Sequence, residues 1–203
     1  MTRILILYGT TDGHTAKIAR RLGDTLGLRG IDADVVNVAL ASARPVGYDG
    51  VIALAPVHLG SYQPELRRWA RTNAPALADV PSAFISVCLG VLQHEPEVQA
   101  EVAAIPRRFL ASVGWQPTVT KVVAGAVLYT RYGWLKRALM RRVVAKAGGD
   151  TDTSRDYEYT DWADLDRFAD QFARLVLRAD GLRQLTAQAA AVGVGVGGAS
   201  TWT

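Results

Sequence analysis

The sequence has few features of secreted or membrane-spanning proteins. Among its 203 residues there is one cysteine, Cys88, which excludes an internal disulfide framework and is compatible with a reducing cytosol. No run reaches the roughly 18 apolar residues that a membrane-spanning helix needs. Met1 leads directly into an apolar strand pattern, so no signal peptide is expected. An apolar fraction of 49% and a charged fraction of 21% are typical of a soluble globular protein, which we expect to be cytoplasmic.

The apolar run at residues 4–8 predicts a buried central strand. Two common nucleotide-binding motifs are missing after this strand. There is no Gly-x-Gly-x-x-Gly, as a dinucleotide site would use, and no Gly-Lys-[Ser/Thr], as a nucleoside triphosphate loop would use. Residues 9–15 are instead small and hydroxylated, and a helical period begins at Ala16. Unpaired backbone amides at a helix N-terminus favour an anion, and threonine hydroxyls can add donors. This stretch predicts a phosphate-binding turn, with an ordinary capped turn as the alternative.

The predicted turn contains no Lys or Arg, which suits a terminal phosphate monoester held mainly by backbone dipoles. Its pattern Thr10-x-x-Gly13-x-Thr15 resembles the [Ser/Thr]-x-Thr-Gly-x-Thr loop with which flavodoxins hold the phosphate of FMN. Asp12 departs from that pattern, because flavodoxins usually carry Thr there and a carboxylate repels a phosphate. We expect the Asp12 side chain to point away from the phosphate and to cap the helix.

Strand and helix patterns alternate along most of the chain, which predicts an α/β protein with a parallel sheet wound on both faces. In a flavodoxin-like sheet the five strands take the order 2-1-3-4-5. Right-handed crossovers place the loops after the first, third and fourth strands at one edge, where ligands of open α/β sheets bind. The strands are predicted at residues 4–8, 32–37, 50–55, 82–88 and 121–126, and the helices from Ala16 and at residues 65–73, 96–113 and 162–177, the last capped by Thr160 or Asp161.

Acidic residues are absent between Lys121 and Gly149, although seven basic residues lie there and the whole chain carries only +4. We read residues 129–150 as a basic insertion before the last helix of one FMN-binding domain at residues 1–178. Residues 181–203 are rich in Ala, Gly and Val and are expected to form a disordered tail.

A helix over residues 134–147 would carry basic side chains nearly all round, so it should not be clearly amphipathic. Long basic side chains and the aromatic residues Tyr129, Tyr132 and Trp134 suit a boundary between water and anionic lipid. The alternative is a solvated excursion that packs Trp134, Leu135 and Leu139 on the body of the domain.

Several stretches together resemble one family, the flavodoxin-like, quinone-dependent protoporphyrinogen oxidases. These proteins share an Asp-Gly phosphate loop, as at residues 11–15, a Gly-x-Tyr loop after the third strand, as at residues 60–62, and a Pro-Ser-Ala-Phe-x-Ser-Val strand, as at residues 81–87. The basic insertion with its exit Gly-Gly-Asp-Thr-Asp-Thr, at residues 148–153, is the most specific match. The similarity covers about residues 2–178. It is weakest at His14, where the family usually has Asn or Gln, and in the loop at residues 88–94.

The resemblance implies an FMN site built from three loops. The first would hold the phosphate, and the other two would flank the isoalloxazine ring, with Tyr62 as the stacking residue. His58 is either a proton relay or a solvated loop residue. Cys88 is expected to pack rather than to act as a nucleophile. The implied cofactor-binding residues are Thr10, Thr11, Asp12, Gly13, His14 and Thr15 in the first loop, Val57, His58, Leu59, Gly60, Ser61 and Tyr62 in the second, and Ser86, Val87, Cys88, Leu89 and Gly90 in the third.

The resemblance also implies a reaction: a reduced tetrapyrrole such as protoporphyrinogen IX is oxidised through FMN, and a membrane quinone takes the electrons, in heme biosynthesis. Arg131, Arg137 and Arg141 would pair with the substrate's propionates. The enzyme would lie peripherally on the inner face of the cell membrane. The alternatives are a flavodoxin-type electron carrier, an FMN-dependent NAD(P)H:quinone reductase and a binding module without flavin. No metal site and no nucleic-acid partner are expected, and the oligomeric state stays open.

Overall fold

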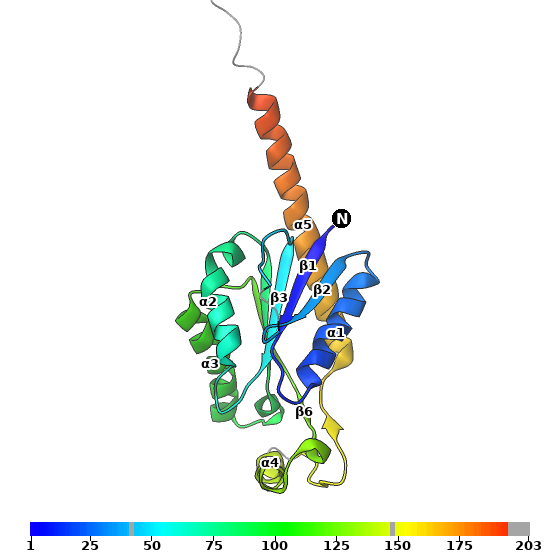
Figure 1. Cartoon of the computed structure of the whole chain (residues 1–203), viewed down its shortest axis with the longest axis vertical. Coiled ribbons are helices and arrows are strands. Elements are labelled where there is room, and N and C mark those ends of the chain that lie inside the picture. The colour runs from blue at the N-terminus through cyan, green and yellow to red at the C-terminus, as the bar shows by residue number, and fades with distance from the viewer. Residues whose placement is uncertain (41–42, 147–148, 195–203) are drawn as a thin grey trace, which may run out of the picture.

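Five parallel strands form the central sheet in the order β2-β1-β3-β4-β5, as predicted (Figure 1). The computed structural model describes residues 1–40, 43–146 and 149–194. Residues 4–7 of the first strand are completely buried, because helices cover both faces of the sheet. The strands are β1 (Arg3–Tyr8), β2 (Asp32–Asn37), β3 (Gly50–Pro56), β4 (Ser82–Val87) and β5 (Val119–Val123).

Two pairs of helices cover the sheet, one pair on each face (Figure 1). Ile4 and Ile6 of β1 pack on the face covered by α1 (His14–Gly27) and α5 (Trp162–Val194). Leu5 and Leu7 pack on the opposite face, which α2 (Pro64–Ala78) and α3 (Pro96–Val113) cover. Successive side chains of a strand point to opposite faces, so one apolar run contributes to both cores. The short helix η1 (Leu89–Leu92) follows β4.

The basic insertion forms a separate small unit beyond the carboxyl ends of the strands (Figure 1). The insertion is longer than the predicted residues 129–150 and runs from residue 126 to residue 158. It contains β6 (Ala126–Val127), the short helix η2 (Tyr129–Arg131), α4 (Trp134–Lys146) and β7 (Tyr157–Glu158), and β6 pairs antiparallel with β7. Residues from these segments bury a core of their own, which includes Val127 and Val144. The insertion therefore stands at the sheet edge where the ligand loops were predicted.

The fifth strand begins and ends earlier than residues 121–126. Val119 pairs with Ala83 and Val123 with Val87, and the chain then leaves the sheet. Two hydrogen bonds stabilise the chain where it leaves the sheet. Thr160 Oγ1 donates to the Ala124 carbonyl, and Tyr159 N donates to the Gly125 carbonyl. The apolar run continues into Ala126–Val127, which is why the sequence pattern does not mark the break.

The aromatic residues of the insertion do not lie together at its surface. Tyr129 and Tyr132 are buried in the core of the insertion, so their predicted place at a lipid boundary is wrong. Trp134 and Leu135 are 80% and 68% exposed, so the alternative in which they pack on the body is wrong for these two residues, and the side chain of Leu139 lies outside the described residues. Among the described side chains of α4, these two are the large apolar residues exposed to solvent.

Among residues 1–40, 43–146 and 149–194, no helix combines the length and the apolar character required to cross a bilayer.

The last helix is longer than predicted. Asp161 caps it, because its Oδ1 accepts a hydrogen bond from Asp164 N at 2.9 Å. The helix continues past Leu177 to Val194 and projects beyond the sheet (Figure 1), so the predicted disordered tail is wrong for residues 181–194. Ala, Leu and Gln are strong helix formers, and a glycine such as Gly181 costs only about 1 kcal/mol within a helix. Residues 195–203 lie outside the described residues.

Candidate active site

The loop between β1 and α1 has the geometry of an anion cradle. Gly13 is the N-cap of α1 with φ +92°, a left-handed conformation that favours glycine. The Gly13 amide donates to Thr10 Oγ1 at 2.9 Å, which ties the loop together. The amides of His14, Thr15 and Ala16 begin the helix and have no intrahelical acceptors. These amides and the positive end of the helix dipole favour an anion at this point.

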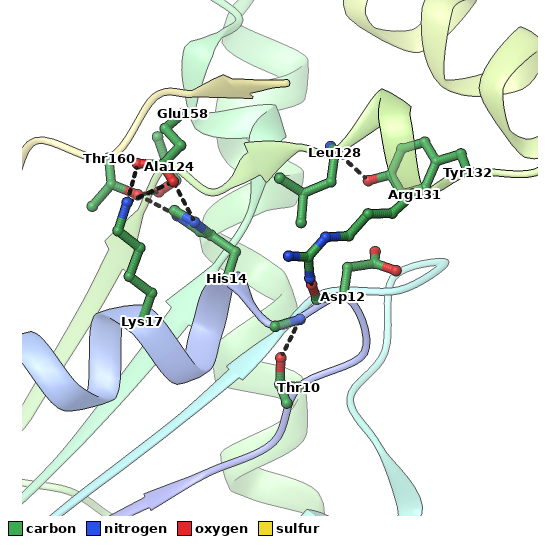
Figure 2. Close-up of polar contacts among 11 residues, drawn as sticks. Thr10, Asp12, His14, Lys17, Ala124, Leu128, Arg131, Tyr132, Glu158 and Thr160 are labelled. Carbon is green, nitrogen blue, oxygen red and sulfur yellow. Dashed lines mark hydrogen bonds and ion pairs between the residues drawn. The ribbon is translucent and has the colours of Figure 1, made fainter. Parts of the chain in front are cut away.

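Asp12 does not cap the helix, which corrects the sequence prediction: the N-cap is Gly13, and no side chain accepts a capping hydrogen bond there. Asp12 instead contacts the insertion. Its carbonyl oxygen accepts a hydrogen bond from Arg131 Nη1 at 2.9 Å (Figure 2). Its carboxylate interacts with the Tyr132 hydroxyl. The Tyr132 hydroxyl also accepts a hydrogen bond from Leu128 N at 3.3 Å. The Asp12 carboxylate therefore contacts the insertion. The residues around Asp12 in the sequence could not predict this contact, because its partner lies more than a hundred positions away.

Gln63 also donates hydrogen bonds to the phosphate loop, and the sequence analysis did not predict this role. Its Nε2 donates to the Thr10 carbonyl at 3.1 Å and lies 3.4 Å from Thr11 Oγ1. A Cβ atom at Gly9 would overlap Gln63 Oε1, so glycine at position 9 is what lets this side chain pass under the loop. The start of α2, where Gln63 stands as N-cap, is therefore coupled to the cradle.

His14 is buried and joins the cradle to the exit of the insertion (Figure 2). The Thr160 hydroxyl donates to the Ala124 carbonyl at 2.7 Å, so its oxygen accepts the 2.8 Å bond from His14 Nε2–H. His14 Nδ1 lies 3.8 Å from Glu158 Oε1, and Glu158 itself pairs with Lys17 at 2.7 Å. Burial lowers the pKa of His14, although Glu158 acts in the opposite direction. The imidazole is therefore neutral at pH 7.

This lowered pKa predicts a pH-dependent stability. The unfolded chain takes up a proton at His14 near pH 6.5, but the folded chain does so only at lower pH. The free energy of unfolding should therefore fall as the pH drops from about 7 through this window, and the His14→Gln variant, which keeps a donor for Thr160, should lose less over the same range. Urea unfolding at pH 7.5 and 5.5 measures the difference. Equal losses in the two proteins would contradict a buried neutral His14.

A cavity of about 490 Å³ opens beside the cradle, at the carboxyl edge of the sheet. Four segments meet in it: the phosphate loop, the loops after β3 and β4, and the insertion. The predicted residues that line it are Thr10, Thr11, Asp12, His14, Thr15, Val57, His58, Leu59, Val87, Cys88, Leu89 and Gly90. The lining residues that sequence reasoning missed are Pro56, Gln93, Gly125, Ala126, Leu128, Tyr132 and Met140. Most of the missed residues belong to the insertion. The spacing of residues in the sequence does not indicate where the insertion lies relative to the sheet, so its contribution to the cavity could not be predicted.

The loop after β3 is a tight turn that reaches the phosphate loop. The backbones of His58 and Ser61 exchange hydrogen bonds of 2.9 and 3.0 Å, and Leu59 and Gly60 both have positive φ, as in a type I′ turn. His58 Nε2 lies 2.9 Å from Thr11 Oγ1, so a hydrogen bond joins the two loops. His58 is thus an exposed residue that lines the cavity and contacts the phosphate loop.

Tyr62 does not line the cavity, and the stacking role predicted for it is wrong. Its ring is 5% exposed and packs edge-on against Phe84 and Phe109 in the core under α2 and α3. Its hydroxyl donates to Ser86 Oγ at 2.7 Å, and Ser86 is completely buried. Burial raises the pKa of Tyr62. Tyr62 and Ser86 therefore form a satisfied polar contact inside the core, and Gly60 and Ser61 remain outside the lining as well.

Cys88 lines the cavity with a thiol that is unsuited to nucleophilic attack. Its sulfur accepts a hydrogen bond from Gly90 N at 3.3 Å, which helps to shape the start of η1. Burial raises the pKa of Cys88, so the thiol stays protonated at neutral pH. The packing role predicted for Cys88 agrees with this environment.

The three candidate arginines of the insertion have different surroundings. Arg131 contacts the phosphate loop through Asp12. Arg137 donates from Nε to the Tyr129 carbonyl and from Nη2 to the Tyr132 carbonyl, both at 3.0 Å, and so holds the turn between η2 and α4. Arg141 lies exposed on α4. Of the three, Arg137 is committed to the insertion's own backbone.

Comparison with known proteins agrees with this geometry. Residues 5–154 match the flavodoxin domain family. The chain is 35% identical over 175 residues to the protoporphyrinogen IX dehydrogenase [quinone] of Escherichia coli K12, covering 85% of this chain and 96% of that protein. It is 34% identical to the protein of the same name from Leishmania major, over 86% of this chain and 76% of the relative.

Among solved structures, oxidised flavodoxin 1 from Bacillus cereus superposes with a TM-score of 0.52 at 13% identity, over 85% of this chain and 98% of that one. This likeness shows the fold alone. The sequence relatives confirm the resemblance inferred from the phosphate loop and the insertion. The chain therefore belongs to the flavodoxin domain family and, within it, to the group that includes the protoporphyrinogen IX dehydrogenases [quinone].

Proposed function

We propose that this protein is an FMN-dependent oxidoreductase that oxidises protoporphyrinogen IX, or a related reduced tetrapyrrole, and passes the electrons to a membrane quinone in heme biosynthesis. The observation that carries the proposal is the shared cavity: the phosphate loop and the insertion that distinguishes this chain from a plain flavodoxin line the same space. The names of the sequence relatives support the substrate and the acceptor.

The residues present fit FMN. Gly13, in a left-handed conformation, is the N-cap of α1. The backbone amides of the first helical turn, which include that of the buried Thr15, have no intrahelical acceptors and can donate to a phosphate. The phosphate loop would hold the 5′-phosphate, and the segments at Val57–Leu59 and Val87–Gly90 would flank the ring, since all of them line one cavity. When bound, FMN supplies the redox chemistry, and the protein supplies position and electrostatic environment.

The chain's own residues would bind the substrate and exclude water. Leu128, Tyr132 and Met140 bring apolar surface from the insertion to the cavity, against which a tetrapyrrole ring can pack. His58, held against Thr11, is placed to hold or release a proton at Nε2 or through the threonine hydroxyl. Arg141 remains the candidate for pairing with a propionate, because Arg137 is occupied by backbone carbonyls.

Association with an anionic membrane surface is part of the proposal. Trp134 and Leu135 are exposed on α4, and Arg141 and Arg142 are exposed on the same helix. An exposed aromatic ring beside cations suits the interface of an anionic bilayer, where a quinone would be accessible. The protein would then act in the cytoplasm, bound peripherally at the inner face of the cell membrane.

An anaerobic assay tests the reaction. Protein loaded with FMN is mixed with protoporphyrinogen IX and a menaquinone analogue, and porphyrin fluorescence is followed. We expect oxidation at least about tenfold faster than with the same concentration of free FMN, because the protein orients both reactants. A rate equal to that of free FMN would refute the proposal. Rapid quinone reduction by NAD(P)H without a porphyrinogen would indicate a quinone reductase instead, and protein that takes up no flavin would indicate a binding module.

A further inference from the structure

A single peptide unit of the phosphate loop is held by Thr10 of the same loop and by Arg131, which is 119 residues away from Asp12 (Figure 2). Arg131 Nη1 donates to the Asp12 carbonyl at 2.9 Å, and the Gly13 amide donates to Thr10 Oγ1 at 2.9 Å. This carbonyl and this amide belong to the same peptide unit. In a planar trans peptide they point in opposite directions, so the two hydrogen bonds fix the orientation of the unit from both sides.

The orientation of this unit matters because the helix begins immediately after it. Gly13 is the N-cap, and the amides of the first helical turn follow. Rotation of the Asp12–Gly13 peptide would redirect the φ of +92° at Gly13 and displace those amides. Arg131 therefore stabilises the conformation in which the cradle is open to an anion.

Arg131 also brings positive charge to a loop that has none of its own. Residues 10–15 contain no Lys or Arg, and the Lys17 ammonium is directed to Glu158 at 2.7 Å and to the Trp162 ring at 5.1 Å. The Arg131 guanidinium lies against Gly13, since a Cβ atom there would be 3.2 Å from its Nη1. A phosphate dianion bound at the helix N-terminus would gain from this cation, and the gain would be weakened by salt.

We propose that Arg131 is a positioning residue for the phosphate of the flavin, and that through it the affinity for that phosphate depends on the insertion. This inference rests on the proposed binding of FMN. It replaces the propionate-binding role that the sequence predicted for Arg131. By linkage, binding of the phosphate stabilises the docked insertion to the same extent that the docked insertion strengthens phosphate binding.

Flavins with and without the phosphate test the inference. Dissociation constants of FMN and riboflavin are measured by flavin fluorescence for the wild type, Arg131→Ala and Arg131→Lys. We expect Arg131→Ala to weaken FMN binding about tenfold and to leave riboflavin binding within about twofold, because riboflavin lacks the group that the loop holds. Arg131→Lys should recover part of the loss, since it keeps the charge and one donor. Arg142→Ala, an equal charge change on exposed α4, should bind both flavins like the wild type.

Each other result overturns the inference. Unchanged FMN affinity in Arg131→Ala would remove the role of Arg131 and leave the proposed function intact. Equal losses for FMN and riboflavin would indicate a general collapse of the insertion, which circular dichroism and hydrogen exchange at residues 126–132 would reveal independently. A wild-type protein that binds neither flavin would refute the proposed function itself, and this inference with it.

Discussion

The Gly13→Ala variant is expected to bind FMN roughly 5- to 150-fold more weakly than the wild type. A side chain at φ +92° costs about 1–3 kcal/mol, which corresponds to roughly 5- to 150-fold in affinity. The added Cβ would also lie 3.2 Å from Arg131 Nη1. In the absence of ligand the loop can shift to relieve this strain, whereas binding of the phosphate would require the original conformation. Titration of the protein with FMN, followed by flavin fluorescence, gives the affinity.

Gly30→Ala is the matched control. Gly30 also has a positive φ, of 73°, but a Cβ atom there would meet nothing within 4 Å, and the residue follows α1 at its far end from the cavity. Gly30→Ala should lose folding stability from backbone strain and keep its affinity for FMN, whereas Gly13→Ala should lose affinity for FMN. Equal affinities in the two variants would contradict the assignment of the cradle.

Reversal of two charges on α4 is expected to abolish most binding to anionic vesicles. Each exposed basic residue near a charged bilayer contributes about 1 kcal/mol, so the Arg141→Glu, Arg142→Glu double variant should bind at least about thirtyfold more weakly. The residual affinity should come from Trp134 and Leu135, which are exposed on the same helix. Sedimentation with vesicles of phosphatidylglycerol and phosphatidylcholine at 50 and 300 mM salt measures the affinity and its screening.

The control reverses two exposed arginines on other helices, Arg20 of α1 and Arg178 of α5, which gives the same change in net charge. Both helices cover the sheet, and α4 lies beyond its carboxyl edge (Figure 1). If the two double variants lose affinity equally, the attraction is that of the whole molecule and α4 is not its membrane-facing element.

Local patterns were sufficient for the sheet and for the first ligand loop. The apolar run at β1, the hydroxyl-rich turn and the helical period of α1 are adjacent in the sequence, so their hydrogen bonds and their burial are determined over short distances. Alternation of strands and helices then left the doubly wound topology as the expected arrangement, and the observed strand order agrees with it.

Tyr62 shows where such patterns stop. The residue follows β3 in a loop that does reach the cavity, and an aromatic residue there suits a flavin. Which way its ring points is decided by packing, because Phe84 and Phe109 from two other elements leave an apolar space that the ring fills. The position of Tyr62 in the sequence places its backbone near the site, but packing in the hydrophobic core directs its side chain away from the cavity.

The sequence by itself determined the strands of the sheet, the glycine-containing turn before α1 and the presence of a basic insertion, because each of these is encoded in contiguous residues. The tertiary structure alone decided that the insertion completes the cavity and that Arg131 and His14 connect it to the phosphate loop. The partners of these two contacts are separated by 119 and 146 residues. No local periodicity spans such separations, so only the packed chain brings these groups together.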